Sequence, residues 1–302
     1  MFHIPVLLEK SLELLLKKKG IYVDLTTGEG GHSKKIAESS MCEKLICFDR
    51  DPDIQRIAKN NLSSYDNIIF INENFANIKN ALKKIGIDSV DGILADLGLS
   101  MYHYRESQKG FSFMNDMKLD MSLDNKRPNA YDVVNSFSEK EIADIIYFNS
   151  DEIHSKKIAR EIVSARKIKR IETTKELADI IKKAIGKYYN KNSRIHPATK
   201  TFQALRIFVN NEIENLKKMI TDSIEILNTG GRIVILTYHS IEDRVVKNMF
   251  KQFSKISFLK IITKKPIIPD YEEIKINPSA RSAKLRAAEK MEVLKCQNTC
   301  FS

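Results

Sequence analysis

The chain has 302 residues, 42% of them hydrophobic, and a formal net charge of +11. This length accommodates one large α/β domain or a core domain with an insertion. No run approaches the roughly 18 uncharged apolar residues of a membrane-spanning helix, and the N-terminus has no leader-like apolar core. We therefore expect a cytoplasmic protein with no membrane partner.

The positive charge is concentrated in two segments. Residues 156–200 contain 14 Lys and Arg against 4 Asp and Glu, and residues 244–290 contain 12 against 4, which leaves the remainder with a net charge of −7. Such a distribution is expected for a polyanionic partner such as RNA. Lysine-rich, solvated helix faces would explain the same composition equally well.

The four cysteines are not arranged as in a zinc or redox site. Cys42 and Cys47 form one loose pair and Cys296 and Cys300 another, without C-x-x-C spacing. We expect reduced thiols and no bound metal.

From the N-terminus onward, strand-like apolar runs alternate with helical stretches. The runs are 21–24, 45–49, 68–71, 90–96 and 232–237, and the helices that follow the first three are 34–38, 53–61 and 78–85. This alternation predicts an α/β fold with a doubly wound, mainly parallel sheet.

The alternation stops after Asp96 and resumes at Gly230. Between them, 139–148, 155–166 and 174–188 are predicted helices, and no segment is typical of a central strand. We predict a helical insertion domain, 105–204, within a discontinuous core made of 1–104 and 205–302. Ligands bind beyond the carboxyl ends of parallel strands, so an insertion leaving the fourth strand is well placed to hold a substrate.

The most informative segment is 22–33, a predicted strand followed by a glycine-rich turn and a helix. Gly28, Gly30 and Gly31 permit a tight turn and the close approach of a ligand, and Ser33 is a candidate helix cap. Nucleotide-type cofactors bind at such turns. An ordinary strand-to-helix turn without a ligand is the alternative.

Two acids in this segment, Asp24 and Glu29, bear on which cofactor binds. Carboxylates would repel the pyrophosphate of a dinucleotide. S-adenosylmethionine (SAM) has no phosphate and carries a cationic sulfonium and an ammonium. The acids therefore favour SAM over NAD.

Asp49 ends the second predicted strand, 21 residues after Gly28, where a ribose-binding carboxylate is expected. A surface charge cluster with Arg50 and Asp51 is the competing interpretation. Phe75, after the third strand, could line an adenine pocket or belong to the core.

Asp96 ends the fourth predicted strand, and Ser100 follows shortly after it. An acid at this position lies where substrate and cofactor meet. Methyl transfer requires a nucleophile held in line with the sulfonium methyl. If the nucleophile is an exocyclic base amine, Asp96 or Ser100 could accept hydrogen bonds from its protons. His239, directly after the fifth strand, is equally a candidate catalytic or structural residue.

Taken together, these segments resemble the RsmH (MraW) family of SAM-dependent methyltransferases. The order and spacing of the matching segments make the resemblance specific. They are residues 3–8, 22–33, 49–52, 91–98, Arg105, 110–113, 119–124, 196–210, 239–244 and 277–286.

The resemblance implies a seven-stranded, Rossmann-like SAM-methyltransferase core with a helical insertion for RNA recognition. The implied reaction is methylation of N4 of a specific cytidine in 16S rRNA, in the decoding region. The cofactor contacts predicted from the turn and from the family together are Asp24, Gly28, Gly30, Gly31, His32, Asp49, Phe75 and Asp96. A glutamine contact of the family falls on His103, and Tyr238 stands where the family has Phe.

We predict that a set of basic residues contacts RNA phosphate, which affects affinity more than the choice of site. These residues are Lys167, Lys169, Arg170, Arg206, Arg244 and Arg281.

The sequence thus predicts an enzyme whose cofactor is SAM and whose partner is 16S rRNA or the small ribosomal subunit, acting as a monomer or a homodimer. An NAD-dependent oxidoreductase is disfavoured by Asp24 and Glu29. A non-catalytic RNA-binding or ribosome-assembly factor is the remaining alternative, in which Asp49 and Asp96 would be dispensable.

Overall fold

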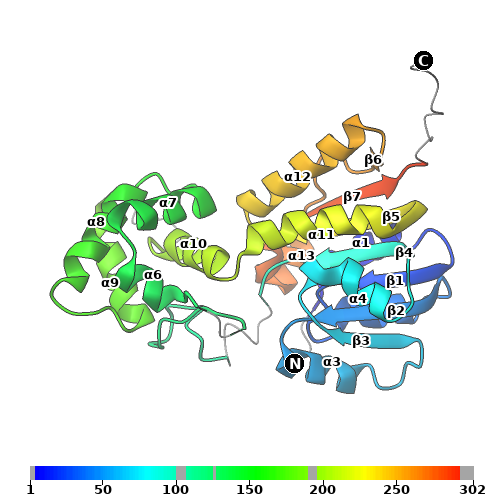
Figure 1. The fold of residues 1–302 in the computed structure, drawn as a ribbon, viewed down its shortest axis with the longest axis horizontal. Helices are drawn as coiled ribbons and strands as arrows, with labels where there is room; N and C mark the ends of the chain where they lie inside the picture. Colours follow the sequence, from blue (N-terminus) through cyan, green and yellow to red (C-terminus); the bar gives the residue numbers. More distant parts are fainter. Residues whose placement is uncertain (1–3, 100–106, 125–126, 190–195, 293–302) are drawn as a thin grey trace, which may run out of the picture. The chain divides into compact units, whose positions relative to one another are not determined.

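The computed structural model describes residues 4–99, 107–124, 127–189 and 196–292. The chain forms two compact units. The first, here called the sheet unit, comprises Met1–Gly98 and Asn215–Ser302, and the second, the helical unit, comprises Leu99–Glu214. Figure 1 shows the elements of both. Among the described residues, none of the helices is both long and apolar enough to cross a bilayer.

The sheet unit contains a seven-stranded sheet in the order β3-β2-β1-β4-β5-β7-β6, which confirms the predicted α/β, mainly parallel architecture (Figure 1). β7 is antiparallel to both of its neighbours, and the other pairs are parallel. The strands are β1 Gly20–Asp24, β2 Cys42–Asp49, β3 Ile68–Asn72, β4 Val90–Asp96, β5 Leu227–Thr237, β6 Leu259–Ile261 and β7 Lys284–Lys290.

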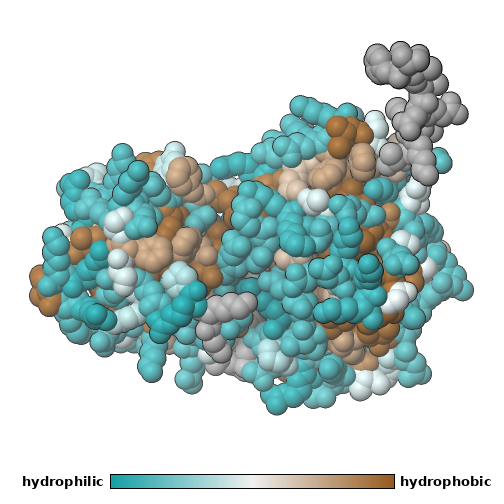
Figure 2. Space-filling model, in the orientation of Figure 1, coloured by the Kyte–Doolittle hydropathy of each residue, from teal (hydrophilic) through white to brown (hydrophobic). Residues whose placement is uncertain are grey.

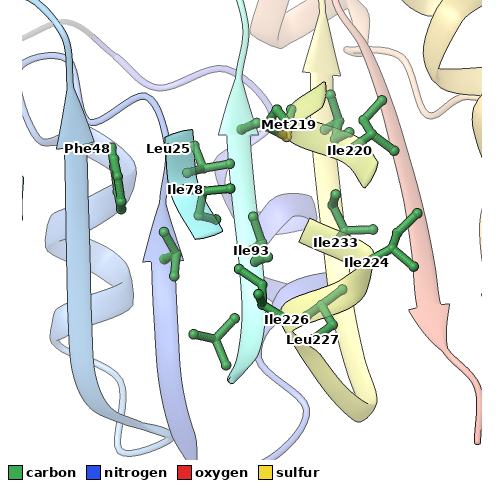
Figure 3. Close-up of a cluster of buried hydrophobic side chains, with 14 of the residues drawn as sticks. Leu25, Phe48, Ile78, Ile93, Met219, Ile220, Ile224, Ile226, Leu227 and Ile233 are labelled. Atoms are coloured by element: carbon green, nitrogen blue, oxygen red, sulfur yellow. The ribbon is translucent and has the colours of Figure 1, made fainter. Parts of the chain in front are cut away.

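Helices cover both faces of this sheet, because its central strands are apolar on both sides. One buried cluster joins α4, α11 and α12 to one face, and another joins α1 and α2 to the other. Figure 3 shows the first cluster, in which Ile224 of α11 lies beside Ile233 of β5 and Ile93 of β4 belongs to the same cluster. The helices of this unit are α1 Leu8–Leu15, α2 Gly31–Ala37, α3 Pro52–Asn61, α4 Ile78–Lys84, α11 Glu212–Ile226 (from Asn215 on), α12 Ser240–Lys255 and α13 Tyr271–Ile276, with 3-10 turns η1 Phe75–Asn77 and η3 Pro278–Ser282.

The prediction that Ser33 caps the helix after the first strand is wrong. Gly30 is the N-cap of α2, and Ser33 lies inside the helix. The physical reason is that the Ser33 hydroxyl donates to the buried carboxylate of Asp24, at 2.6 Å, instead of accepting from a backbone N–H.

The helical unit has its own hydrophobic core, and its described part contains helices and no named strand. Capping boxes at Asn129, Ser138 and Thr173 begin three of the helices. The predicted boundary at residue 205 would fall within α10, and both domain boundaries stay predictions. The helices are α6 Ala130–Ser136, α7 Glu139–Ser150, α8 Ser155–Arg166, α9 Thr174–Ile185 and α10 Thr199–Val209, with the 3-10 turn η2 Gly186–Tyr188.

Hydrophilic side chains cover most of the face shown in Figure 2, with smaller hydrophobic areas between them. Several large apolar side chains are nevertheless exposed in the helical unit. They are Met114, Tyr147, Phe148, Ile153, Ile168 and Tyr188.

A buried ion pair ties α12 to β7 within the sheet unit. Arg286 donates from Nε to Asp243 Oδ1 at 2.6 Å and from Nη2 to Oδ2 at 3.2 Å. Burial raises the pKa of the Asp243 carboxyl, but the hydrogen bonds and charge of Arg286, with a contribution from Lys284, outweigh burial and lower that pKa below its ordinary value of 3.8. The carboxylate is therefore the form that stabilises the fold.

We expect Asp243→Asn to lower the free energy of unfolding at neutral pH by about 2 kcal/mol, because Arg286 stays buried without its anionic partner. A group whose pKa is lowered by folding stabilises at neutral pH and loses this contribution as the pH falls. Denaturant titrations at a series of pH values should show the difference between wild type and variant shrinking toward acid. Glu13→Gln, which removes an exposed pair with Lys10, is the control and should leave stability unchanged. A difference independent of pH would contradict the assignment.

Candidate functional site

Three strands of the sheet unit end in aspartate at the same edge. Asp24 ends β1, Asp49 ends β2 and Asp96 ends β4. The strand order reverses between β1 and β4, since β2 and β3 lie on one side of β1 and β4 and β5 on the other. Ligands of open α/β sheets bind at this reversal, beyond the carboxyl ends of the strands.

The glycine-rich turn between β1 and α2 lies at this edge. Its backbone torsion φ is 55° at Gly28 and 97° at Gly30, values that favour glycine. A Cβ on Gly31 would lie 2.5 Å from Pro5, so this residue must be small. A Cβ on Gly28 would meet only the Thr26 carbonyl oxygen, at 3.9 Å. Among the described residues, no side chain lies within 4 Å of that Cβ position, which leaves this side of the turn open to a ligand.

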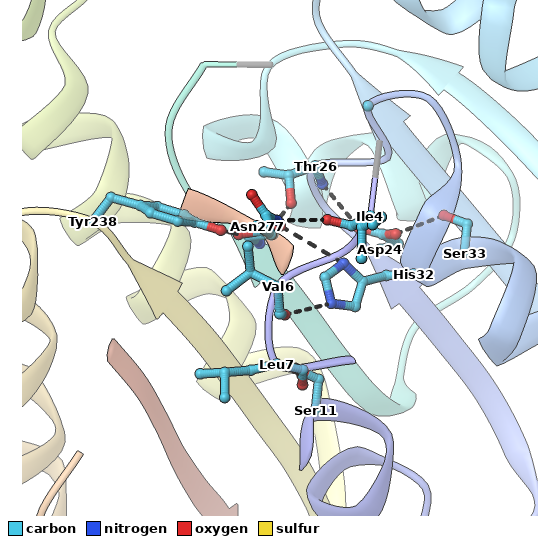
Figure 4. Close-up of polar contacts among 12 residues, drawn as sticks. Ile4, Val6, Leu7, Ser11, Asp24, Thr26, His32, Ser33, Tyr238 and Asn277 are labelled. Atoms are coloured by element: carbon cyan, nitrogen blue, oxygen red, sulfur yellow. Dashed lines mark hydrogen bonds and ion pairs between the residues drawn. The ribbon is translucent and has the colours of Figure 1, made fainter. Parts of the chain in front are cut away.

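Asp24 is fully buried beneath the turn. Its two carboxylate oxygens accept from the Thr26 N–H, at 3.1 Å, and from the Ser33 hydroxyl. Burial raises the pKa of this carboxyl above its ordinary value, and the Ser33 hydrogen bond opposes that rise. These contacts, drawn in Figure 4, give Asp24 a structural part in shaping the turn. Its side chain is fully buried, and its contact with the cofactor stays a prediction.

Asp49 joins β2 to the same turn. Its Oδ2 accepts from the Gly28 N–H at 3.1 Å, and its Oδ1 accepts from the Asp51 N–H at 2.9 Å. The Asp49 carboxylate is thus held beside the accessible part of the turn, where an adjacent sugar hydroxyl could share it. Phe75 begins η1 just after β3 and is partly buried against the first hydrophobic cluster.

Within the described part of the chain, Tyr238 and His32 each approach one carboxylate oxygen of Asp96. The Tyr238 hydroxyl donates to Oδ1 at 2.7 Å, and Nδ1 of His32 lies 3.7 Å from Oδ2. The other ring nitrogen of His32 lies 3.2 Å from the Val6 carbonyl oxygen. Figure 4 shows His32 between Val6 and Asp24, and Tyr238 reaching toward them from the end of β5. The Asp96 N–H donates to Thr26 Oγ1 at 2.6 Å. The carboxylate is therefore held in one orientation, with 18% of its side-chain surface exposed.

The bond between Tyr238 and Asp96 could not be read from the sequence. Tyr238 was notable there only as a tyrosine directly after a strand, at a position where the resembling family has phenylalanine. The single feature that could have indicated the contact is the phenol, placed at the carboxyl end of the strand beside the one that ends in Asp96.

His239 is the N-cap of α12. Its Nδ1 accepts from the Glu242 N–H at 3.3 Å, and its Nε2 lies 3.1 Å from Glu242 Oε1. Through these contacts His239 stabilises the start of α12. A catalytic role for His239 stays a prediction. Ser100 and His103 lie outside the described residues.

The predicted RNA-binding residues differ in their contacts. Lys167, Arg244 and Arg281 are exposed. Lys169 pairs with Glu176 at 2.6 Å, and Arg170 donates to the Tyr131 hydroxyl at 3.1 Å. Arg206 is mostly buried and pairs with Glu212 at 3.0 Å within the helical unit. The structure thus favours a structural role for Arg206 besides the predicted one.

Comparison with known proteins agrees with this geometry. The model of the MraW methylase family matches residues 1–291. The ribosomal RNA small subunit methyltransferase H of Finegoldia magna is 46% identical over 307 residues, which cover 96% of this chain and 98% of the relative. The protein of the same name from Clostridioides difficile is 48% identical over 311 residues, which cover 96% and 99%.

We expect the Tyr238 phenol to remain protonated through the range in which free tyrosine ionises. Burial, the charge of Asp96 and the hydrogen bond to it all raise the pKa of Tyr238 well above its ordinary value of 10.0. Ultraviolet titration of the folded protein should therefore show the same number of ionising tyrosines in wild type and in Tyr238→Phe. Tyr271→Phe, which removes the phenol of a side chain that is 75% exposed, serves as the reference for the loss of one group. One fewer ionising tyrosine in Tyr238→Phe would contradict the geometry.

Proposed function

This chain belongs to the MraW methylase family, and we propose that it transfers a methyl group from SAM to small-subunit ribosomal RNA, at N4 of a cytidine in 16S rRNA. The observation that carries the proposal is the set of three strand-terminal aspartates around an accessible glycine turn. Ribosomal subunits are in the cytoplasm, and we place the reaction there.

Two features of the sheet unit support SAM as the cofactor. The edge that carries the turn concentrates carboxylates, which suits a ligand with a sulfonium and an ammonium and opposes a pyrophosphate. The backbone at Gly28 is uncrowded, and the Asp49 carboxylate is fixed beside it by the Gly28 and Asp51 N–H groups. In this proposal Asp49 accepts the ribose hydroxyls, Phe75 contacts the adenine, and Gly28, Gly30, Gly31 and His32 line the remainder.

SAM supplies an activated methyl group on a cationic sulfur. What the protein must add is the orientation of the cytidine amine, whose lone pair is delocalised into the base. In our proposal the Asp96 carboxylate accepts a hydrogen bond from this amine, which turns the nitrogen toward the methyl and favours the loss of its proton. Tyr238 and His32 fix the Asp96 carboxylate, so the acceptor is oriented before the substrate arrives.

The charge distribution supports RNA as the substrate. The chain has net charge +11, and its basic residues are concentrated in segments 156–200 and 244–290. In this proposal the exposed Lys167, Arg244 and Arg281 contact phosphates, which position the RNA without reading its sequence. Lys169, Arg170 and Arg206 have acidic or phenolic partners within the chain, and in this proposal they contribute less than Lys167 and Arg281.

The reaction is tested by mapping modified nucleosides in ribosomal RNA by mass spectrometry. In cells lacking this gene we expect one N4-methylcytidine of 16S rRNA to disappear, and a plasmid copy of the wild-type gene to restore it. Asp96→Asn should lower the rate of methyl transfer in vitro by about 10²-fold or more, because the amide is a weaker acceptor that also turns donors toward the substrate. An unchanged 16S rRNA would remove the proposed reaction. Full restoration by Asp96→Asn would favour a non-catalytic assembly role.

Cofactor binding is tested separately by calorimetric titration with SAM. Asp49→Ala should weaken SAM binding by about tenfold or more, since hydrogen bonds to a charged group are lost. Asp88→Ala removes an exposed acid outside the turn and is the matched control, expected to bind SAM as the wild type does. Thermal unfolding of each variant verifies that the turn remains folded. Equal SAM affinity in Asp49→Ala and wild type would remove Asp49 from the site.

A further inference from the structure

A stacked pair of aromatic rings, of which the tyrosine is exposed, lies in the helical unit. The proposed function assigns phosphate contacts to this unit through Lys167 but gives these two rings no role. The rings of His154 and Tyr188 are stacked, with centroids 4.5 Å apart and an interplanar angle of 25°. His154 precedes α8, and Tyr188 ends η2. Tyr188 is 50% exposed, so a large part of its ring faces solvent.

Two lysines flank this pair. Lys157 Nζ donates to the Tyr188 hydroxyl at 3.0 Å and lies 4.6 Å from the centre of its ring, and Lys187 Nζ lies 5.3 Å from the same centre. The hydrogen bond and charge of Lys157, with the charge of Lys187, lower the pKa of Tyr188. The ring therefore lies in a local positive field.

A buried carboxylate holds the two aromatic segments together. Glu152, only 2% exposed, accepts from the His154 N–H through Oε1 and from the Tyr189 hydroxyl through Oε2, both at 2.9 Å. Burial and this carboxylate raise the pKa of Tyr189 to about 12, so its phenol stays a donor. One side chain thus fixes the start of α8 and the end of η2, and the stacked rings are oriented in advance.

The neighbouring tyrosines have opposite environments. Tyr189 packs against the hydrophobic core of the helical unit and bonds to Glu152, so it serves the fold. Tyr188, one residue earlier, points its ring outward between lysines. An exposed ring stacked on a second ring adds little to the core but offers a flat apolar surface.

The positive charge in the segments that carry the two rings favours an anionic partner. Residues 153–160 and 182–188 contain six cationic side chains and no acidic one. They are Lys156, Lys157, Arg160, Lys182, Lys183 and Lys187. Of these, Lys183 pairs with Glu161 at 2.6 Å and Arg160 with Glu139 at 3.6 Å. Aromatic rings bordered by lysines are how proteins bind single-stranded nucleic acid, with bases on the rings and phosphates on the cations.

We propose that the Tyr188–His154 pair, with Lys157 and Lys187, is a stacking site for an unpaired base of single-stranded RNA. The base lies against the Tyr188 ring, and the two ammonium groups contact the adjacent phosphates. The lysine stems are flexible, so the amines can turn from the ring to the phosphates. This site rests on the proposed function only in that an RNA substrate provides the strand.

The test is fluorescence anisotropy of a labelled twelve-nucleotide single-stranded RNA titrated with the full chain at several salt concentrations. Tyr188→Ala should weaken binding by about fivefold or more, the usual effect of losing one stacked base. Tyr188→Phe keeps the ring and should stay within about twofold of the wild type. Tyr271→Ala removes a tyrosine that is 75% exposed elsewhere and is the matched control, expected to leave binding unchanged.

A second oligonucleotide with the same number of phosphates but abasic at every position separates stacking from charge. On it, Tyr188→Ala should bind as the wild type does. Lys157→Ala and Lys187→Ala should each lower the slope of log affinity against log salt by about 0.7, the value for one phosphate contact on a single strand.

Several results would overturn the site. These are equal affinity of Tyr188→Ala and wild type for the normal strand, an equal loss on the abasic strand, or no binding of the wild type at low salt. A Tyr188→Ala variant that binds RNA normally but loses affinity for RNA-free ribosomal proteins would assign the surface to a protein partner instead. Methyl transfer is measured in a separate assay. If the chain methylates RNA but its affinity for RNA does not depend on Tyr188, the stacking site is wrong and the proposed reaction stands. If RNA affinity depends on Tyr188 but the chain methylates no RNA, the proposed reaction is wrong and the stacking site stands.

Discussion

The convergence of three aspartates at one edge of a parallel sheet is the constraint on which the other features of the site depend. Like charges at neighbouring strand ends repel, and each carboxylate is accommodated differently. Asp24 is buried and bonded to Ser33, Asp49 accepts two backbone N–H groups, and Asp96 receives the phenol of Tyr238 with His32 nearby. The turn, the start of α2 and the end of β5 are shaped by these contacts, and 18% of the Asp96 side chain remains exposed.

This acidic edge belongs to a chain of net charge +11. Because the chain carries an acidic edge as well as basic segments, a polyanion can bind only in certain orientations. Phosphates are repelled by carboxylates and attracted by the basic segments 156–200 and 244–290. A neutral base with donor groups suffers no such repulsion and can approach Asp96. In our proposal, the basic segments therefore bind the RNA backbone and the acidic edge recognises the reacting amine. Stacking of a base on Tyr188, also proposed, would add a contact that depends on neither kind of charge.

Much of the fold followed from the sequence, because hydrophobic periodicity reports burial directly. The five apolar runs became β1 to β5, and the three helices predicted between residues 139 and 188 are α7, α8 and α9 with η2. The residue patterns did not predict β6, which has only three residues, or β7, whose alanines and charged residues are more typical of a helix. The strand-end acids were also apparent. The contacts of Tyr238 with Asp96 and of Glu152 with Tyr189 were not, because they join segments distant in sequence. The contact of Ser33 with Asp24 was not either, because it depends on the path that the turn takes between them.

The central claim is that SAM binds at the acidic, glycine-lined edge of the sheet, and a crystal structure of the chain with SAM tests it most directly. Our account predicts the ribose hydroxyls within hydrogen-bond distance of the Asp49 carboxylate, the adenine against Phe75 and the sulfonium methyl directed toward Asp96. A structure with SAM bound elsewhere, or with the edge beside Gly28 closed to it, would contradict the account.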